Sequence, residues 1–291
     1  MKRFQDKLST NQFLVTSEVV PPKGTDLSEL EKVVPILQRS VDAVNVTDGS
    51  GAMMRATPLA ISHWLFKRDI DPIFQITCRD RNRLALQADL LGASILGVRN
   101  ILILTGDDPK QGDHPDAKPV FDVTSGQLMH VARQLEKGQD MAGKELTGKP
   151  EFCIGAAANP GNPKLEEEAS KCQQKKDAGA EFFQTQAVFD IEGFRTFAQA
   201  VAPLKAKCLA GVLLLKSAKM ARYMNEHVWG IKVPDTLMDR MERAADKRAE
   251  CVKIAGELIR GIKDVAGGVH LYPLGWDDLI PDVLKEAGVS R

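Results

Sequence analysis

Short apolar runs alternate with longer amphipathic stretches along the whole chain, and this alternation most constrains its fold. Most of the runs are β-branched and continuously apolar, as parallel strands covered by helices on both faces tend to be. We predict eight strands, at residues 13–20, 42–48, 71–78, 100–107, 151–159, 182–189, 210–217 and 268–275. Between them, apolar residues return every three or four positions, which indicates helices. The predicted helices include 27–40, 82–97, 164–180 and 238–265.

Eight strand–helix units in 291 residues average about 36 residues each, which suits a (β/α)8 TIM barrel of the usual ~250 residues with modest insertions. No linker or shift in composition divides the chain, so we predict one α/β domain over residues 1–291. The alternative is an open, doubly wound sheet with a G-x-G-x-x-G turn after the first strand. The turn at that place reads PPKGTD, which favours the barrel.

The charge balance argues for small-molecule chemistry. Lys and Arg number 39 and Asp and Glu number 39, so the basic surface of a nucleic-acid or membrane-surface binder is not expected. No apolar run is long enough for a membrane span, and the first residues lack the apolar core of a secretory signal. Five scattered cysteines without a C-x-x-C pair indicate a reducing compartment. We therefore predict a cytoplasmic protein with no membrane or nucleic-acid partner.

The histidines give no sign of a metal site. The five of them, at positions 63, 114, 130, 227 and 270, lack the spacing of metal ligands. We expect most of them on helix surfaces or in loops, and we predict no metal.

The chemistry of a TIM barrel gathers at the carboxyl ends of its strands, where the βα loops meet. Glu18 is the most unusual residue at these ends, because a carboxylate within the apolar run LVTSEVV is costly to bury unless it is paired or used. Two interpretations stand: an ion pair inside the barrel, with Lys216 as the candidate partner, or a catalytic role. The loop TGDDPKQGDHP after the fourth strand is either an ordinary turn or a binding site for an anion such as pyrophosphate.

Six segments, in this order, resemble one family. They are SEVVPPKG (17–24), NVTDGSG (45–51), ITC (76–78), LTGDDP (104–109), KKDAGAEFFQTQAVFD (175–190) and VHLYPLG (269–275). The chain resembles the methylenetetrahydrofolate reductases along nearly its full length. The resemblance implies flavin-dependent reduction of 5,10-methylenetetrahydrofolate to 5-methyltetrahydrofolate, as in methionine biosynthesis, with hydride from N5 of the reduced flavin.

The resemblance also implies roles for individual residues. Glu18 falls on the general acid and Asp107 on the carboxylate beside the flavin and pterin. Gln186 falls on a folate-binding glutamine, and Tyr272 is expected to wall the same pocket. The cofactor would be FAD, with NADH or NADPH as the electron donor. The predicted cofactor-binding positions are Thr47, Gln75, Thr105, Gly106, Asp107, Phe121, Asn159, Glu168 and Lys175.

This sequence departs from the family pattern at several positions. Gln75 stands where many members have histidine and Thr105 where they have arginine, and Ala218 and Trp276 replace a customary aromatic residue and an arginine. Weaker contacts to the cofactor phosphates make FMN an alternative to FAD. The segment 213–235 is similar to variant reductases of anaerobic one-carbon pathways, some of which receive electrons from a partner subunit.

Two further functions are therefore weighed beside the reductase. The chain could be a non-autonomous flavin- and folate-binding subunit that needs a redox partner, and self-association into a homo-oligomer is equally open. A flavin barrel that oxidises another substrate, as proline dehydrogenase does, is the other alternative, because a fold alone does not define a function. Glu18, Asp107 and Gln186 favour the folate reaction, because this trio suits a pterin and a leaving nitrogen.

Overall fold

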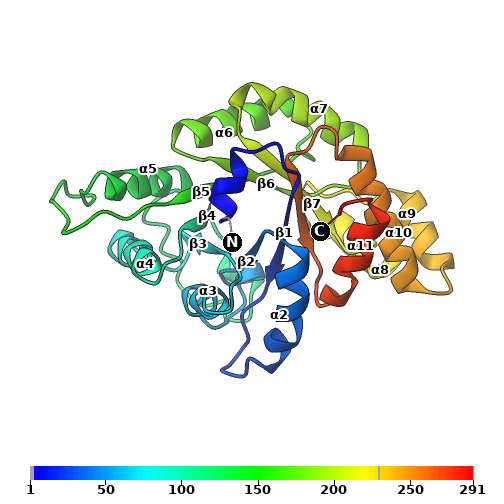
Figure 1. Ribbon diagram of the computed structural model, residues 1–291, viewed down its shortest axis with the longest axis horizontal. Coiled ribbons are helices and arrows are strands. Elements are labelled where there is room, and N and C mark those ends of the chain that lie inside the picture. Colours follow the sequence, from blue (N-terminus) through cyan, green and yellow to red (C-terminus); the bar gives the residue numbers. More distant parts are fainter. Residues whose placement is uncertain (1–2, 229, 291) are drawn as a thin grey trace.

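The computed structural model describes residues 3–228 and 230–290, so residues 1–2, 229 and 291 of the predicted domain lie outside the described residues. Eight parallel strands close into a barrel in chain order, with β1 paired to both β2 and β8 (Figure 1). The strands are β1 (Leu14–Val19), β2 (Ala43–Val46), β3 (Pro72–Thr77), β4 (Asn100–Leu104), β5 (Cys153–Ala158), β6 (Phe182–Ala187), β7 (Lys207–Leu213) and β8 (Gly268–Tyr272). The predicted (β/α)8 barrel is confirmed.

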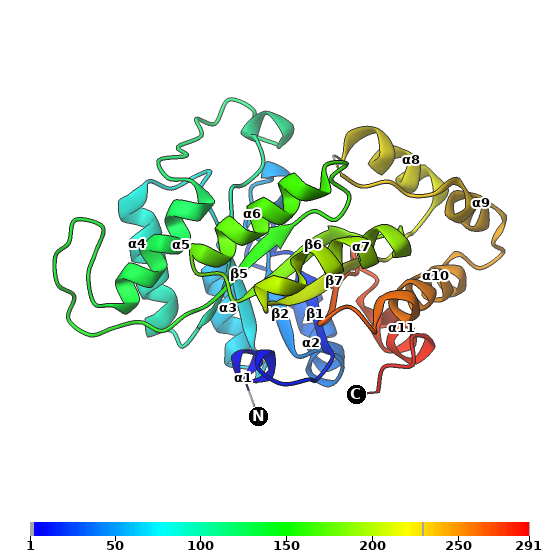
Figure 2. The same cartoon turned by 90° about the horizontal axis from the view of Figure 1, so that it is seen from above.

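Helices surround this barrel, and short 3-10 turns lie in four of the connections. The helices are α1 (Phe4–Leu8), α2 (Ser28–Ser40), α3 (Pro58–Phe66), α4 (Arg83–Ile95), α5 (Ser125–Glu136), α6 (Leu165–Asp177), α7 (Ile191–Val201), α8 (Ala218–His227), α9 (Asp235–Arg243), α10 (Lys247–Ile262) and α11 (Ile280–Glu286). The 3-10 turns are η1 (Ser50–Ala52), η2 (Pro109–Gln111), η3 (Ala202–Leu204) and η4 (Asp277–Leu279). In Figure 2, α1 lies at one end of the barrel and the loop with η2 at the opposite end.

The structure corrects two predicted boundaries. The helix expected over 238–265 is two helices, because Ala244 takes an extended conformation and the Asp246 side chain caps α10 by accepting from the amides of Arg248 and Ala249. The strand expected at 210–217 is β7, which begins at Lys207 and ends at Leu213. Leu214 and Leu215 are buried beyond the strand, so apolar character alone does not mark where the hydrogen-bonded ladder ends.

Alternate side chains of each strand point into the barrel, and the interior changes from apolar to polar along its axis. A cluster of interior side chains fills the end near α1, where the ring of Phe4 meets Phe182 edge-on at 5.1 Å. Its fully buried or nearly buried members are Phe4, Leu14, Ala43, Ile73, Leu102, Cys153, Phe182 and Leu209. Two residues further along β1, β2, β6 and β8, the inward positions are polar. This apolar floor closes the barrel at the end opposite its mouth.

The outward positions form the main hydrophobic core against the helices. Val15, Val44 and Ile101 are fully buried examples, and they belong to one large cluster with residues of α2, α4 and α5. Within the described residues, no helix is long and apolar enough to cross a membrane.

A substitution at Gly155 would test how tightly the floor of the barrel is packed. A Cβ on this β5 residue would lie 2.3 Å from the ring of the fully buried Phe182, so Gly155→Ala should destabilise the fold by about 1–3 kcal/mol through overpacking. Urea unfolding measures the change. Gly24→Ala is the control, because a Cβ at Gly24 meets no atom within 4 Å. Equal stability of the two variants would contradict this packing.

Candidate active site

A hydrogen-bonded polar layer crosses the barrel above its apolar floor. Gln184 of β6 donates to Asn45 Oδ1 and to Thr16 Oγ1, both at 3.0 Å, and Asn45 Nδ2 donates to Gln184 Oε1 at 2.6 Å. Thr16 Oγ1 lies 2.9 Å from His270 Nδ1. All four side chains are buried, so these mutual bonds offset the cost of removing them from water.

Glu18 lies directly above this layer, two residues after Thr16 on β1. Its side chain is 14% exposed, and its Oε2 is 3.8 Å from His270 Nε2. His270 therefore faces the polar layer with one ring nitrogen and Glu18 with the other. The predicted ion pair with Lys216 is not formed: Lys216 Nζ donates to the carbonyl of Leu274.

Tyr272 completes the β8 side of the mouth. Its ring meets the His270 ring edge-on at 4.6 Å, and its hydroxyl donates to the carbonyl of Thr185 at 2.8 Å. Burial raises the pKa of Tyr272, and the nearby Glu18 carboxylate raises it further, so the phenol stays neutral. Gln186, at the end of β6, is exposed.

The ends of β2, β3 and β4 present a different set of groups. Thr47 is 2% exposed, and among the described residues its Oγ1 has no hydrogen-bond partner. Gln75 of β3 is also buried. Gly106 has φ +95°, and a Cβ there would lie 2.8 Å from Arg79 Cβ, so the tight backbone course after β4 requires glycine.

The loop after β4 is tied to the loops on either side. Asp107 is exposed, and its Oδ2 accepts from the amide of Gly51 at 2.8 Å, which joins the β4 and β2 loops. Thr105 is exposed as well. Phe121 is 41% exposed, and its amide donates to the carbonyl of Cys78. This loop therefore presents both a carboxylate and an aromatic ring to solvent.

Two predicted cofactor residues are already engaged within the protein. Glu168 of α6 is 4% exposed, and it accepts from the Asn159 amide at 2.9 Å and from Asn162 Nδ2 at 3.2 Å. Lys175 donates to the carbonyl of Ala157 at 2.7 Å. Both side chains hold the end of β5 and its loop in place.

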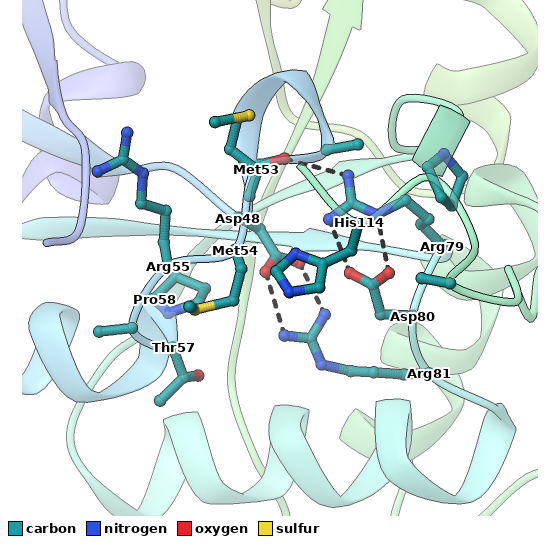
Figure 3. A pocket seen from close by; sticks show the side chains of 15 residues that line it. Asp48, Met53, Met54, Arg55, Thr57, Pro58, Arg79, Asp80, Arg81 and His114 are labelled. Carbon is teal, nitrogen blue, oxygen red and sulfur yellow. Dashed lines mark hydrogen bonds and ion pairs between the residues drawn. The ribbon is translucent and has the colours of Figure 1, made fainter. Parts of the chain in front are cut away.

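A cavity of about 360 Å³ lies beside the ends of β2 and β3 (Figure 3). Asp48 binds Arg81 through two hydrogen bonds, at 2.7 and 3.1 Å, and also accepts from the amide and hydroxyl of Thr77. Arg79, only 5% exposed, pairs with Asp80 and donates to the carbonyl of Gly49. Arg55 also lines this cavity.

The sequence interpretation missed two features of this end of the barrel. His270 lies in the strand predicted at 268–275, but its place in the barrel interior was not recognised, and its spacing of two from Tyr272 is the signal that puts both on the inward face. The arginines of CRDRN, directly after β3, were not singled out. These arginines place cationic groups at the mouth, although Thr105 stands where many members of the family have an arginine. Among the described residues, no group of three or more His, Cys, Asp or Glu side chains is arranged to hold a metal ion.

The structure belongs to the TIM-barrel class: a closed (β/α)8 barrel with a carboxylate at its mouth, above a buried polar layer, where the active sites of such barrels are built. Residues 3–288 match the family model of methylenetetrahydrofolate reductase, and the chain belongs to this family. It is 24% and 25% identical to methylenetetrahydrofolate reductases 1 and 2 of Schizosaccharomyces pombe, over 84% and 98% of its length. It covers only 40% and 47% of those two proteins.

A bacterial relative is closer to this chain in length. The 5,10-methylenetetrahydrofolate reductase of Pectobacterium carotovorum is 23% identical over 94% of this chain and 90% of its own length. Among solved structures, a Clostridium thermocellum protein that binds two copies of 5-methyl-5,6,7,8-tetrahydrofolic acid has a TM-score of 0.64 at 15% identity, with 96% and 97% of the two chains covered. A 2,3-dimethylmalate lyase has a TM-score of 0.54 at 13% identity, over 98% of this chain and 85% of its own. At these identities the likeness shows the fold alone.

Asp48 should be important for the stability of the mouth. Asp48→Asn removes the charge that pairs with Arg81, so we expect a loss of about 2–4 kcal/mol in the free energy of unfolding, measured with urea. The control is Asp122→Asn, because Asp122 pairs with the half-exposed Arg83 and its loss should matter much less. A larger effect at Asp122 than at Asp48 would show that the buried pair does not stabilise the mouth.

Proposed function

We propose that this chain reduces 5,10-methylenetetrahydrofolate to 5-methyltetrahydrofolate, with Glu18 as general acid. The observation that carries the proposal is the Glu18 carboxyl at the barrel mouth, 3.8 Å from a buried histidine, in a chain of this family. Fold alone would not distinguish this reaction from another flavin-dependent oxidation. The name of the bacterial relative supports the same substrate.

Glu18 is proposed to supply the proton that the reaction needs. The methylene carbon of the substrate bridges two nitrogens, so the ring must open to a cationic iminium before reduction, and a proton on the leaving nitrogen makes that possible. Among the described residues, the basic side chain within 4.0 Å of the Glu18 carboxyl is His270, which is 1% exposed. Through its other ring nitrogen His270 contacts Thr16 and Gln184, so the layer orients the ring toward Glu18.

The ends of β2, β3 and β4 suit a flavin. Within the described part of the chain, the hydroxyl of the buried Thr47 has no hydrogen-bond partner and could bind a ligand, and the backbone at Gly106 allows close approach. A bound flavin, FAD or alternatively FMN, would supply the hydride chemistry. Thr47, Gln75, Gly106 and Asp107 would hold it, with Phe121 and Thr105 from the same loop and Asn159 from the β5 side. Glu168 and Lys175 would contribute by positioning the β5 loop.

On the substrate side, Gln186 and Tyr272 are proposed to contact the folate. Gln186 is exposed at the end of β6, and the Tyr272 hydroxyl binds the carbonyl of the neighbouring Thr185, so both lie on the β6–β8 side of the mouth. Asp107, on the opposite side, would stabilise the iminium cation electrostatically. The single-domain organisation, the cytoplasmic location and the oligomeric state stay predictions.

Anaerobic stopped-flow of the purified chain loaded with flavin tests the proposal. Flavin absorbance should fall on addition of NADH or NADPH, and also on addition of 5-methyltetrahydrofolate as the reverse reductant. Reduction by the folate alone would identify a chain that depends on a redox partner for electrons. If the folate does not reduce the flavin, the proposed reaction is wrong.

Glu18→Gln should separate the two half-reactions. The amide keeps the size of the side chain but cannot donate the proton, so folate turnover should fall by about 10²-fold or more while flavin binding and reduction by the nicotinamide persist. The control is Glu31→Gln on the exposed face of α2, which should behave like the unsubstituted chain. Folate turnover within about twofold of normal in Glu18→Gln would exclude Glu18 as the acid.

Asp107→Asn should mainly slow the folate half-reaction. Loss of the negative charge removes stabilisation of the iminium cation, and we expect a decrease of roughly 10- to 100-fold with a much smaller effect on flavin reduction. Asp116→Asn, an exposed change in the same loop, is the control. A defect confined to flavin reduction by the nicotinamide would instead assign Asp107 to the electron-donor side.

A further inference from the structure

A cavity of about 250 Å³ reaches Glu18 from the side, between β1, α2 and the segment after β8. Its volume has room for several water molecules, since each occupies about 30 Å³ in the liquid. Most of the lining residues are apolar, and the ionisable residues among them are Glu18, Glu29 and Asp277. The cavity therefore brings Glu18 together with Glu29 and Asp277, two acidic residues that have no role in the proposed reduction.

Asp277 is the first residue of η4, which packs against α2. Burial, together with the negative charges of Asp278 and Glu18, raises the pKa of Asp277 to about 6. Lys216 acts in the opposite direction and lowers it. Asp277 can thus both accept and donate a proton near neutral pH.

The other charged groups around Asp277 are engaged elsewhere. Lys216 donates to the carbonyl of Leu274 and lies 5.0 Å from the centre of the Trp276 ring. Glu29 pairs with Lys32 on the surface of α2, and Asp278 pairs with Arg248 of α10. Within residues 3–228 and 230–290, Asp277 forms no ion pair.

We propose that Asp277 is the group through which the Glu18 carboxyl exchanges its proton with solvent, by way of this cavity. The inference rests on the proposed role of Glu18 as the acid. When folate or nicotinamide fills the mouth, the direct route from solvent to Glu18 is covered. On the interior side of Glu18 stands His270, which is 1% exposed.

The proton balance is simple. Glu18 gives its proton to the leaving nitrogen of the folate and becomes a carboxylate. A water molecule in the cavity then passes a proton to Glu18 and takes one from the Asp277 carboxyl, and Asp277 is protonated again from bulk solvent. One proton enters for each proton used, and no redox step is involved. Asp277 therefore acts through Glu18, by returning a proton to it, and does not contact the substrate.

The first test does not depend on catalysis. The carboxyl carbon of Asp277 is followed by ¹³C NMR in chain labelled at aspartate and assigned by its loss in Asp277→Asn. We expect a midpoint near pH 6 and a shift to lower pH in Glu18→Gln, because the Glu18 charge that favours the protonated form of Asp277 is gone. An unchanged midpoint in Glu18→Gln overturns the proposed exchange.

The second test measures folate turnover against pH. Asp277→Asn should lower steady-state turnover about 10-fold near pH 6, where the Asp277 carboxyl is partly protonated, with partial recovery on addition of formate, whose carboxyl group is small enough for the cavity. Asp278→Asn, the adjacent exposed carboxylate, should stay within about twofold of normal. A normal rate in Asp277→Asn across the pH range overturns the exchange route alone. Absence of folate turnover in the unsubstituted chain would instead count against the proposed function.

Discussion

Closure of eight parallel strands into a ring forces every second side chain of each strand into one shared interior, and the candidate site depends on how that interior is filled. Apolar side chains close one end around Phe4 and Phe182. Polar groups can then be buried above them only as a mutually satisfied set, which Thr16, Asn45, Gln184 and His270 provide. This layer carries Glu18 at its upper surface.

The position of Glu18 places one carboxyl between two very different environments. His270 lies on its interior side, where both ring nitrogens have partners and the side chain is almost fully buried. On the lateral side is the cavity with Asp277, where burial and neighbouring negative charge favour the protonated carboxyl. In a site of low dielectric, such charges act strongly on one another. The proposed proton transfer at Glu18 would thus be linked to residues on β8 and the turn that follows it.

Particular residues show how far the sequence could be interpreted. The strand pattern located the eight strands, and it located the ends where Glu18, Thr47, Gly106, Asp107 and Tyr272 gather, because apolar periodicity follows directly from which faces are buried. The same pattern misplaced β7 and merged α9 with α10, since apolar character continues beyond a ladder and since one capping aspartate can begin a new helix. Lys216, the candidate partner of Glu18 in one of the two interpretations, lies beyond the end of β7 and donates to the carbonyl of Leu274 instead.

What the sequence by itself determined is the barrel, the family and the set of polar residues at the strand ends, because these depend on local periodicity and on the order of motifs along the chain. Only the tertiary structure decided the partners of those residues. His270 beside Glu18, Arg81 on Asp48, Glu168 on the Asn159 amide and Asp277 across a cavity from Glu18 join strands, loops and helices far apart in the chain. Such pairings follow from the register and curvature of the closed sheet, which no local pattern encodes.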